Sequence, residues 1–349
     1  MRFSGFLAIV AMCMALVACG GGGGGSAADT SSSSGGSASC ANNPVLTSAT
    51  TFYGVTPEGG VGTWTFDTAA LTSHYVVGSS TGNTALTLDA ASCAYTSTST
   101  GVLRTAFASS SAHADLAVSA ASVAGVNTAA LLMASPETVL ANAAGTYNLM
   151  IVEYERPAGG NSVPTSTFAT LQVDTAGAWS LCRGASYSST CGGPTGSLAT
   201  HAGGGFDLVS GGNTLGRVFV KASGLKKVMT VAFNDTTQPS TTVSGMWVGA
   251  TNDVWVAGAN DGVYVTNTNQ QSSSLHTLTG LTIKPNARPT AAPLIANQPV
   301  QGAFEIVTGD IGQASYLNDV GIVSSLGIYA DTAKSNSTSS GFIRFGVKP

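Results

Sequence analysis

The sequence predicts an all-β protein built of antiparallel sandwich or barrel units, and three observations support this prediction. Short runs rich in Thr, Val, Ala and Ser are separated by Gly, Asn and Asp at intervals of roughly 8 to 12 residues, a spacing typical of sandwiches and barrels. Good examples of strand patterns lie at residues 62–67, 146–156, 216–222, 227–233, 253–258 and 262–267. Turn signals stand between such runs, for example at residues 81–83 and 260–262.

One short helix is expected at residues 136–143, because Ser135 can cap a helix that begins with Pro136 and Glu137. Gly145 then ends the helix, and a long strand follows. We place a domain boundary at this helix, which predicts two β domains at residues 40–135 and 136–349. The segment 284–302 contains four prolines and is expected to be a linker or an extended strap across the surface.

The first 18 residues have the pattern of a secretion signal. Arg2 precedes an apolar run at residues 6–17, which is shorter than the roughly 20 residues that a bilayer span needs. The run ends in the letters LVAC at residues 16–19, which resemble the lipobox of bacterial lipoproteins. This resemblance implies cleavage before Cys19 and acylation of Cys19, with palmitate among the expected modifications. Because Gly20 follows in place of an Asp, it also implies the outer membrane.

Composition limits the partners that the protein can have. Residues 20–39 are mostly Gly and Ser and cannot bury a core, so we expect a flexible leash between the lipid and the fold. Charged residues make up 9% of the chain, the net charge is −4, and no Lys or Arg lies between Arg2 and Arg104. A nucleic-acid binder needs a basic footprint. We therefore expect the membrane, a protein, a glycan or an apolar small molecule as partner, and no nucleic acid or cofactor.

The cysteines indicate an oxidising compartment. Of the six, Cys13 leaves with the signal and Cys19 takes the lipid, which leaves Cys40, Cys93, Cys182 and Cys191. An even number outside the cytoplasm suggests two disulfides, for which three pairings exist. The short separation favours Cys182 with Cys191, and then Cys40 with Cys93. A zinc site is disfavoured because the spacings are not C-x-x-C and no His lies near these cysteines.

Two patterns suggest catalysis, and each has a simpler structural interpretation. Ser80 lies in GSSTG, which matches a nucleophile elbow, but a strand-like segment follows where the elbow needs a helix, so a hairpin turn is favoured. Glu153 and Glu155 face the same side of a strand, as a glycosidase pair could. A solvated strand end is the favoured interpretation. The scattered histidines form no known metal motif, so neither a metal site nor an enzyme is expected; they are His74, His113, His201 and His276.

Five aromatic residues are candidates for ligand contact. Trp247, Trp255 and Tyr264 lie on successive expected strands, and their rings would gather on one face if those strands pair as a meander. Such rings form either a stacking platform or core, and flanking apolar residues favour core. The letters GTW at 62–64 and GTY at 145–147 resemble the G-x-W start of lipocalins. That resemblance implies a barrel for an apolar ligand, with Trp64 or Tyr147 near its cavity.

The sequence thus predicts a lipoprotein of the bacterial outer membrane that faces the periplasm or the cell surface. Its β-rich ectodomain is expected to have a non-catalytic, structural or interaction role. A lipocalin-like module that binds a small apolar ligand or a glycan is the alternative, and a Ser hydrolase or glycosidase comes third.

Overall fold

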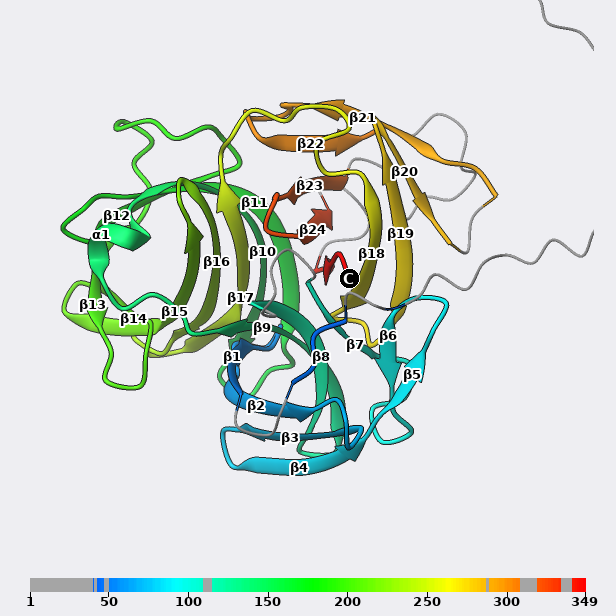
Figure 1. The fold of residues 1–349 in the computed structure, drawn as a ribbon. Helices are drawn as coiled ribbons and strands as arrows, with labels where there is room; N and C mark the ends of the chain where they lie inside the picture. Colours follow the sequence, from blue (N-terminus) through cyan, green and yellow to red (C-terminus); the bar gives the residue numbers. More distant parts are fainter. Residues whose placement is uncertain are drawn as a thin grey trace, which may run out of the picture. The chain divides into compact units, whose positions relative to one another are not determined.

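The computed structural model describes residues 40, 43–46, 50–108, 115–286, 289–307, 319–333 and 341–349. The expected signal peptide, Cys19 and the leash to residue 39 lie outside these ranges. Within them the protein is almost entirely antiparallel β structure, which confirms the predicted fold class (Figure 1). Among the described residues, no helix has the length and apolar character that a membrane crossing requires.

The first sheet, here called the N-terminal sheet, has nine strands in the order β4-β3-β2-β1-β9-β8-β7-β6-β5. It curls so that β3 reaches β8, where the Tyr75 hydroxyl donates to the Ser122 carbonyl at 3.2 Å and accepts from the Ser122 amide at 3.1 Å. Its strands are β1 Thr51–Val55, β2 Val61–Asp67, β3 Thr72–Val77, β4 Ser80–Ala85, β5 Thr87–Asp89, β6 Ala94–Thr96, β7 Arg104–Phe107, β8 Leu116–Val123 and β9 Val126–Ala134.

The expected helix is present as α1, Leu140–Ala143, and is shorter than its sequence suggested. Its cap is Val139, which makes no side-chain capping bond, so Ser135 does not have the predicted capping role. The Glu137 amide instead donates to the Val220 carbonyl at 2.8 Å. Residues 135–137 are therefore held along a neighbouring strand, and the helix begins one turn later.

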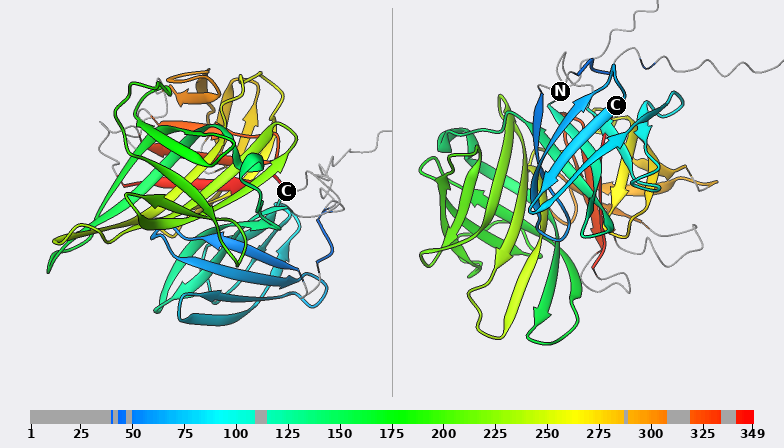
Figure 2. Two further views of the ribbon diagram at one scale, coloured as in Figure 1. Left: turned by 90° about the vertical axis from the view of Figure 1, so that its left-hand side faces the viewer. Right: turned by 90° about the horizontal axis from the view of Figure 1, so that it is seen from below.

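The second sheet closes on itself, because β10 pairs with both β11 and β17. This first barrel consists of β10 Gly145–Pro157, β11 Val163–Val173, β12 Ala178–Arg183, β13 Thr195–Thr200, β14 Phe206–Ser210, β15 Asn213–Ser223, β16 Lys226–Asp235 and β17 Thr241–Thr251. Figure 2 shows the hairpins β10–β11 and β16–β17 projecting at the end opposite α1. Alternating inward side chains fill its interior, as period-2 strands require.

The third sheet also closes, since β18 pairs with both β19 and β25. This second barrel consists of β18 Gly262–Thr268, β19 Ser273–Thr279, β20 Thr282–Pro285, β21 Ala292–Ala296, β22 Ala303–Ile306, β23 Asp319–Val323, β24 Ile328–Ala333 and β25 Ile343–Val347. Residues 136–349, expected as one domain, thus form two barrels. The proline-rich segment supplies β21 and the end of β20, and the Pro293 carbonyl accepts from the Val307 amide at 2.9 Å. Proline keeps this acceptor although it lacks the donor.

The three sheets share one apolar core within a single compact unit. It joins outward side chains of both barrels to one face of the N-terminal sheet, for example Leu131, Val248 and Phe345. Polar contacts reinforce the junction: the Asn267 side chain accepts from the Arg104 amide at 3.0 Å and donates to the Arg104 carbonyl at 2.7 Å. Part of the outer face of each barrel is therefore buried against the other sheets.

Candidate binding site at the mouth of the first barrel

The inward face of β10 changes character along the strand. Tyr147, Leu149 and Ile151 point into the first barrel and belong to its apolar core. The next inward position is Glu153, whose residue is 9% exposed. Charged side chains are seldom this buried unless they are paired. Glu153 therefore marks the place where the apolar interior ends and a polar mouth begins.

Two strands position the Glu153 carboxylate. Arg183, at the end of β12, donates from Nη2 to Oε1 at 2.8 Å, and Trp247, on β17, donates from Nε1 to the same oxygen at 3.1 Å. No hydrogen bond among the described residues ends on Oε2. The position opposite Glu153 is Gly245, where an added Cβ would lie 2.1 Å from the Val152 carbonyl oxygen. Glycine there lets the two strands approach closely beside the carboxylate.

A pocket of about 260 Å³ opens at this end of the barrel. Its walls are mostly aromatic and aliphatic, and the Trp247 ring stacks on Phe233 with centroids 4.9 Å apart. Three charged side chains face it, and two of them are acidic. The lining residues are Glu153, Trp179, Leu181, Arg183, Pro194, Leu215, Phe233, Asp235, Val243 and Trp247. An apolar pocket with a few convergent polar groups is the usual form of a small-molecule site.

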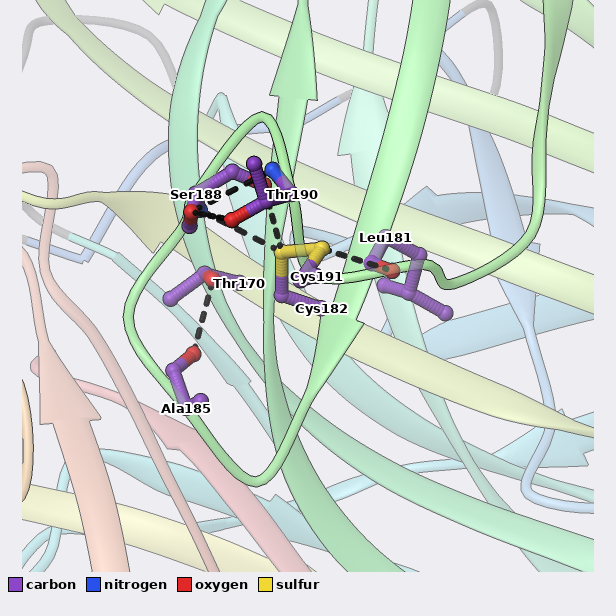
Figure 3. Close-up of a disulfide and its surroundings, with 7 residues drawn as sticks. All are labelled: Thr170, Leu181, Cys182, Ala185, Ser188, Thr190 and Cys191. Carbon is purple, nitrogen blue, oxygen red and sulfur yellow. Dashed lines mark hydrogen bonds between the residues drawn. A yellow bond between two sulfur atoms is a disulfide. The ribbon is translucent and has the colours of Figure 1, made fainter.

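A disulfide supports the rim of this pocket. Cys182 is bonded to Cys191 and directly precedes Arg183, so the clipped loop restrains the strand end that carries the guanidinium (Figure 3). The Thr170 hydroxyl donates to the Ala185 carbonyl at 2.8 Å and holds the loop to β11. The Cys40–Cys93 disulfide is also formed, so both expected pairings are confirmed.

The two patterns that suggested catalysis have different outcomes. Ser80 begins β4 after a turn at Gly78, and its hydroxyl accepts from the Ala124 amide at 3.3 Å. It therefore lies in a hairpin, as the simpler interpretation predicted. Glu155 is exposed and does not line the pocket, so the second carboxylate there is Asp235. Among the described residues, no cluster of three or more His, Cys, Asp or Glu could hold a metal ion.

The five aromatic candidates do not form one surface. Trp247 belongs to the first barrel and Tyr264 to the second, so their strands do not pair as a meander. Trp255 lies in the segment between β17 and β18, where a strand was expected, and all three side chains are buried. Trp64 is 1% exposed and packs in the core of the N-terminal sheet. Tyr147 is buried below α1, and its hydroxyl donates to the Ala143 carbonyl at 2.7 Å. Trp64 and Tyr147 are thus buried in apolar clusters, and of the five candidates only Trp247 lines the pocket described above.

Eight of the ten lining residues were not singled out in the sequence, and four of these carry charge or an aromatic ring: Arg183, Trp179, Phe233 and Asp235. The alternation of β12 and β16 places each of them inward, which is a detectable signal. This alternation does not show that the ends of β12 and β16 lie near the end of β10, because that depends on how the strands pair around the closed barrel.

No family model matches this chain, and no curated protein matches it either. Among solved structures, the chain is similar to a protein of unknown function from the DUF3598 family of Nostoc punctiforme. The two are 11% identical with a TM-score of 0.20, over 61% of this chain and 98% of the other.

Proposed function

We propose that this protein is a lipid-anchored, non-catalytic binding module whose ligand enters the mouth of the first barrel. The observation that carries the proposal is the Glu153 carboxylate, which is buried yet faces a pocket and is held by Arg183 and Trp247. A pre-positioned acceptor surrounded by aromatic walls fixes the orientation of a ligand without chemistry on it.

The ligand class follows from the lining. The open oxygen of Glu153 accepts a hydrogen bond, the half-exposed Arg183 has further donors, and Trp179, Trp247 and Phe233 offer ring surfaces. Sugars combine hydroxyl groups with an apolar ring face and match all three features. Glu153 and Asp235 outnumber Arg183, so a neutral ligand suits the pocket better than an anionic one. We therefore propose a mono- or disaccharide unit of a glycan as the ligand.

Intrinsic tryptophan fluorescence tests this proposal, because Trp179 and Trp247 line the pocket. Mono- and disaccharides are titrated into two proteins. Both are the full chain with Cys19→Ser, and one of them also carries Glu153→Gln. We expect saturable quenching, and we expect the affinity to weaken at least tenfold in the variant, since loss of one hydrogen bond to a charged group is worth about 1.5 to 3 kcal/mol.

The matched control is Glu155→Gln, two residues along the same strand, exposed and outside the pocket. It should bind as the wild type does. Equal weakening by both substitutions, or no saturable response to any sugar, would refute the site. A bare mass in a native mass spectrum, recorded after incubation with extract of the producing cells, would then favour a protein partner and the structural or interaction role.

The anchor is a separate part of the proposal, supported by the lipobox resemblance at residues 16–19 and the glycine run after Cys19. Multiple acyl chains give stable membrane attachment, and one chain gives only marginal attachment. Cys19→Ser should release the protein from the outer-membrane fraction of the producing cells. Retention of that variant in the membrane would contradict the anchor and leave the binding pocket untouched.

A further inference from the structure

The second barrel carries charged side chains in its interior. Asp331 on β24 and Arg344 on β25 are cross-strand partners, and Arg344 donates from Nη1 to Asp331 Oδ2 at 2.7 Å. Asp319 lies on the neighbouring strand β23, where Gly321 is opposite Asp331. Because inward positions alternate, Asp319 faces the same interior as Asp331, one diagonal step away. All three residues are buried: Asp319 is 1% exposed, Asp331 is 0% exposed and Arg344 is 6% exposed.

Several polar atoms around this pair have no hydrogen-bond partner within the described part of the chain. They are both carboxyl oxygens of Asp319 and Oδ1 of Asp331. A buried polar atom without a partner costs about 1 to 3 kcal/mol, and a charged one costs more. Buried carboxyl oxygens that have no partner among the described residues favour the protonated, neutral form of one of the two groups.

Among the described residues, the other titratable groups that face this cluster add no positive charge to it. Tyr329 and Tyr264 stay neutral because burial raises the pKa of each hydroxyl. His276, whose Nε2 lies 2.8 Å from the Ser274 hydroxyl, also stays neutral, since burial and Arg344 hold its pKa well below the usual value. On the outer side, the packed strand β10 presents the Tyr154 hydroxyl, which accepts from Asn269. Glu305 is paired with Val320 and lies on the outer face of β22.

The charge balance then requires one more positive charge. Two carboxylates and one guanidinium sum to a net negative charge in a site removed from water, where an isolated charge is very costly. A single proton makes the cluster neutral. Placed on Asp319, it removes the charge of the carboxyl group that has no partner among the described residues.

We propose that Asp319 and Asp331 bind one proton between them, which makes the interior of the second barrel a pH-sensitive lock. Asp331 is the carboxylate, because it is bonded to Arg344, and Asp319 is the acid. Burial, and next the negative charge of Asp331, raise the pKa of Asp319 to about 8 against the opposing effect of Arg344. Loss of the proton leaves two carboxylates and one guanidinium without water, which loosens β23 against β24.

The sign of the pH dependence follows from linkage. Asp319 has an unperturbed pKa of 3.8 and binds its proton more tightly in the folded barrel. The folded state therefore holds more protons than the unfolded state between these two pKa values, and stability falls as pH rises through this interval. The contribution is fully present below about pH 4 and is lost once pH passes about 8. A periplasmic or surface location would expose the lock to the pH of the medium.

Thermal unfolding of the full chain between about pH 6 and pH 9 tests the lock, with Asp319→Asn as the decisive variant. Asparagine keeps the shape of the side chain and stays neutral at every pH. We expect the wild-type Tm to fall by several degrees over this range, and the variant to lose most of that fall and to exceed the wild type at pH 9. Asp253→Asn, which removes an exposed partner of Lys226, should keep the wild-type slope.

A spectroscopic measurement keeps the test decisive if the variant folds poorly. In the wild type labelled with carboxyl-¹³C aspartate, one resonance should titrate near pH 8 and should be absent from Asp319→Asn. The proposal is overturned if every aspartate titrates below about pH 5, where ordinary carboxyl groups do. It is also overturned if Asp319→Asn keeps the wild-type slope, or if a stoichiometric metal is present and a chelator abolishes the pH dependence.

Discussion

The two barrels have the same number of strands and each directs one carboxylate–guanidinium pair inward, yet the pairs have different surroundings. In the first barrel, Glu153 and Arg183 lie at an open mouth, and the arginine side chain is 41% exposed. In the second, the Asp331 and Arg344 side chains are 0% and 7% exposed, and a third charged group, Asp319, lies beside them. Water reaches one pair and is excluded from the other.

This difference decides what each pair can do. At the mouth, solvent screens the pair, so the arginine can move and a ligand can replace water at little cost. In the sealed interior, desolvation dominates, and every charge must be balanced by a partner or a proton. The same two functional groups therefore form a recognition element in one barrel and a structural, pH-sensitive element in the other.

The largest expected effect comes from removing the arginine of each pair. Arg344→Met should lower the free energy of unfolding by about 3 to 5 kcal/mol, because Asp331 would remain buried without its partner. Arg183→Met should cost about 1 kcal/mol or less, since its pair is partly solvated. Urea unfolding near neutral pH measures both. Similar losses for the two variants would remove the distinction between a sealed and an open pair.

The double variant Asp331→Leu with Arg344→Met sharpens the comparison. It removes both charges of the sealed pair, so its cost should be smaller than the sum of the two single costs. An additive result would mean that Arg344 and Asp331 do not depend on each other, contrary to their 2.7 Å contact.

A smaller effect is expected from the disulfide at the mouth. Replacement of Cys182 and Cys191 by Ser opens a loop with a sequence separation of 9, which should cost about 2 to 3 kcal/mol by loop-closure entropy. Sugar binding should weaken as well, because the strand end that carries Arg183 loses its restraint. Fluorescence titration and thermal unfolding check both effects. The pH dependence of the second barrel should stay as in the wild type, and a change there would mean that the two barrels are coupled.

Part of the candidate site could be recognised in the sequence. Glu153 stands out because a charged residue follows the apolar inward positions of a long strand, and Trp247 stands out as an aromatic residue in another strand. Arg183 and Asp235 belong to β12 and β16, which are each one strand removed from β10, and their place at the same mouth depends on how the strands pair around the barrel. Local alternation predicts the face of a strand, while closure of the barrel decides which faces share a mouth.

The sealed cluster is harder to anticipate. Asp319, Asp331 and Arg344 are separated along the chain and fit no spacing motif. In the sequence, Asp331 resembles the polar end of a strand, and the expected location of such residues is solvent. Only the pairing of β23, β24 and β25 brings these residues together, and only burial changes their protonation.

The sequence by itself determined the antiparallel β class, the short helix before the long strand and the two cysteine pairs. The β class and the helix depend on local periodicity and turn chemistry, which act within a few residues. The first cysteine pair follows from its short separation along the chain, and the second pair follows by elimination. Tertiary structure alone decided that the region after residue 136 forms two barrels, that Trp247 and Tyr264 lie apart, and which charged pair is exposed to water. These features depend on long-range strand pairing and on the exclusion of solvent, and neither can be read from neighbouring residues.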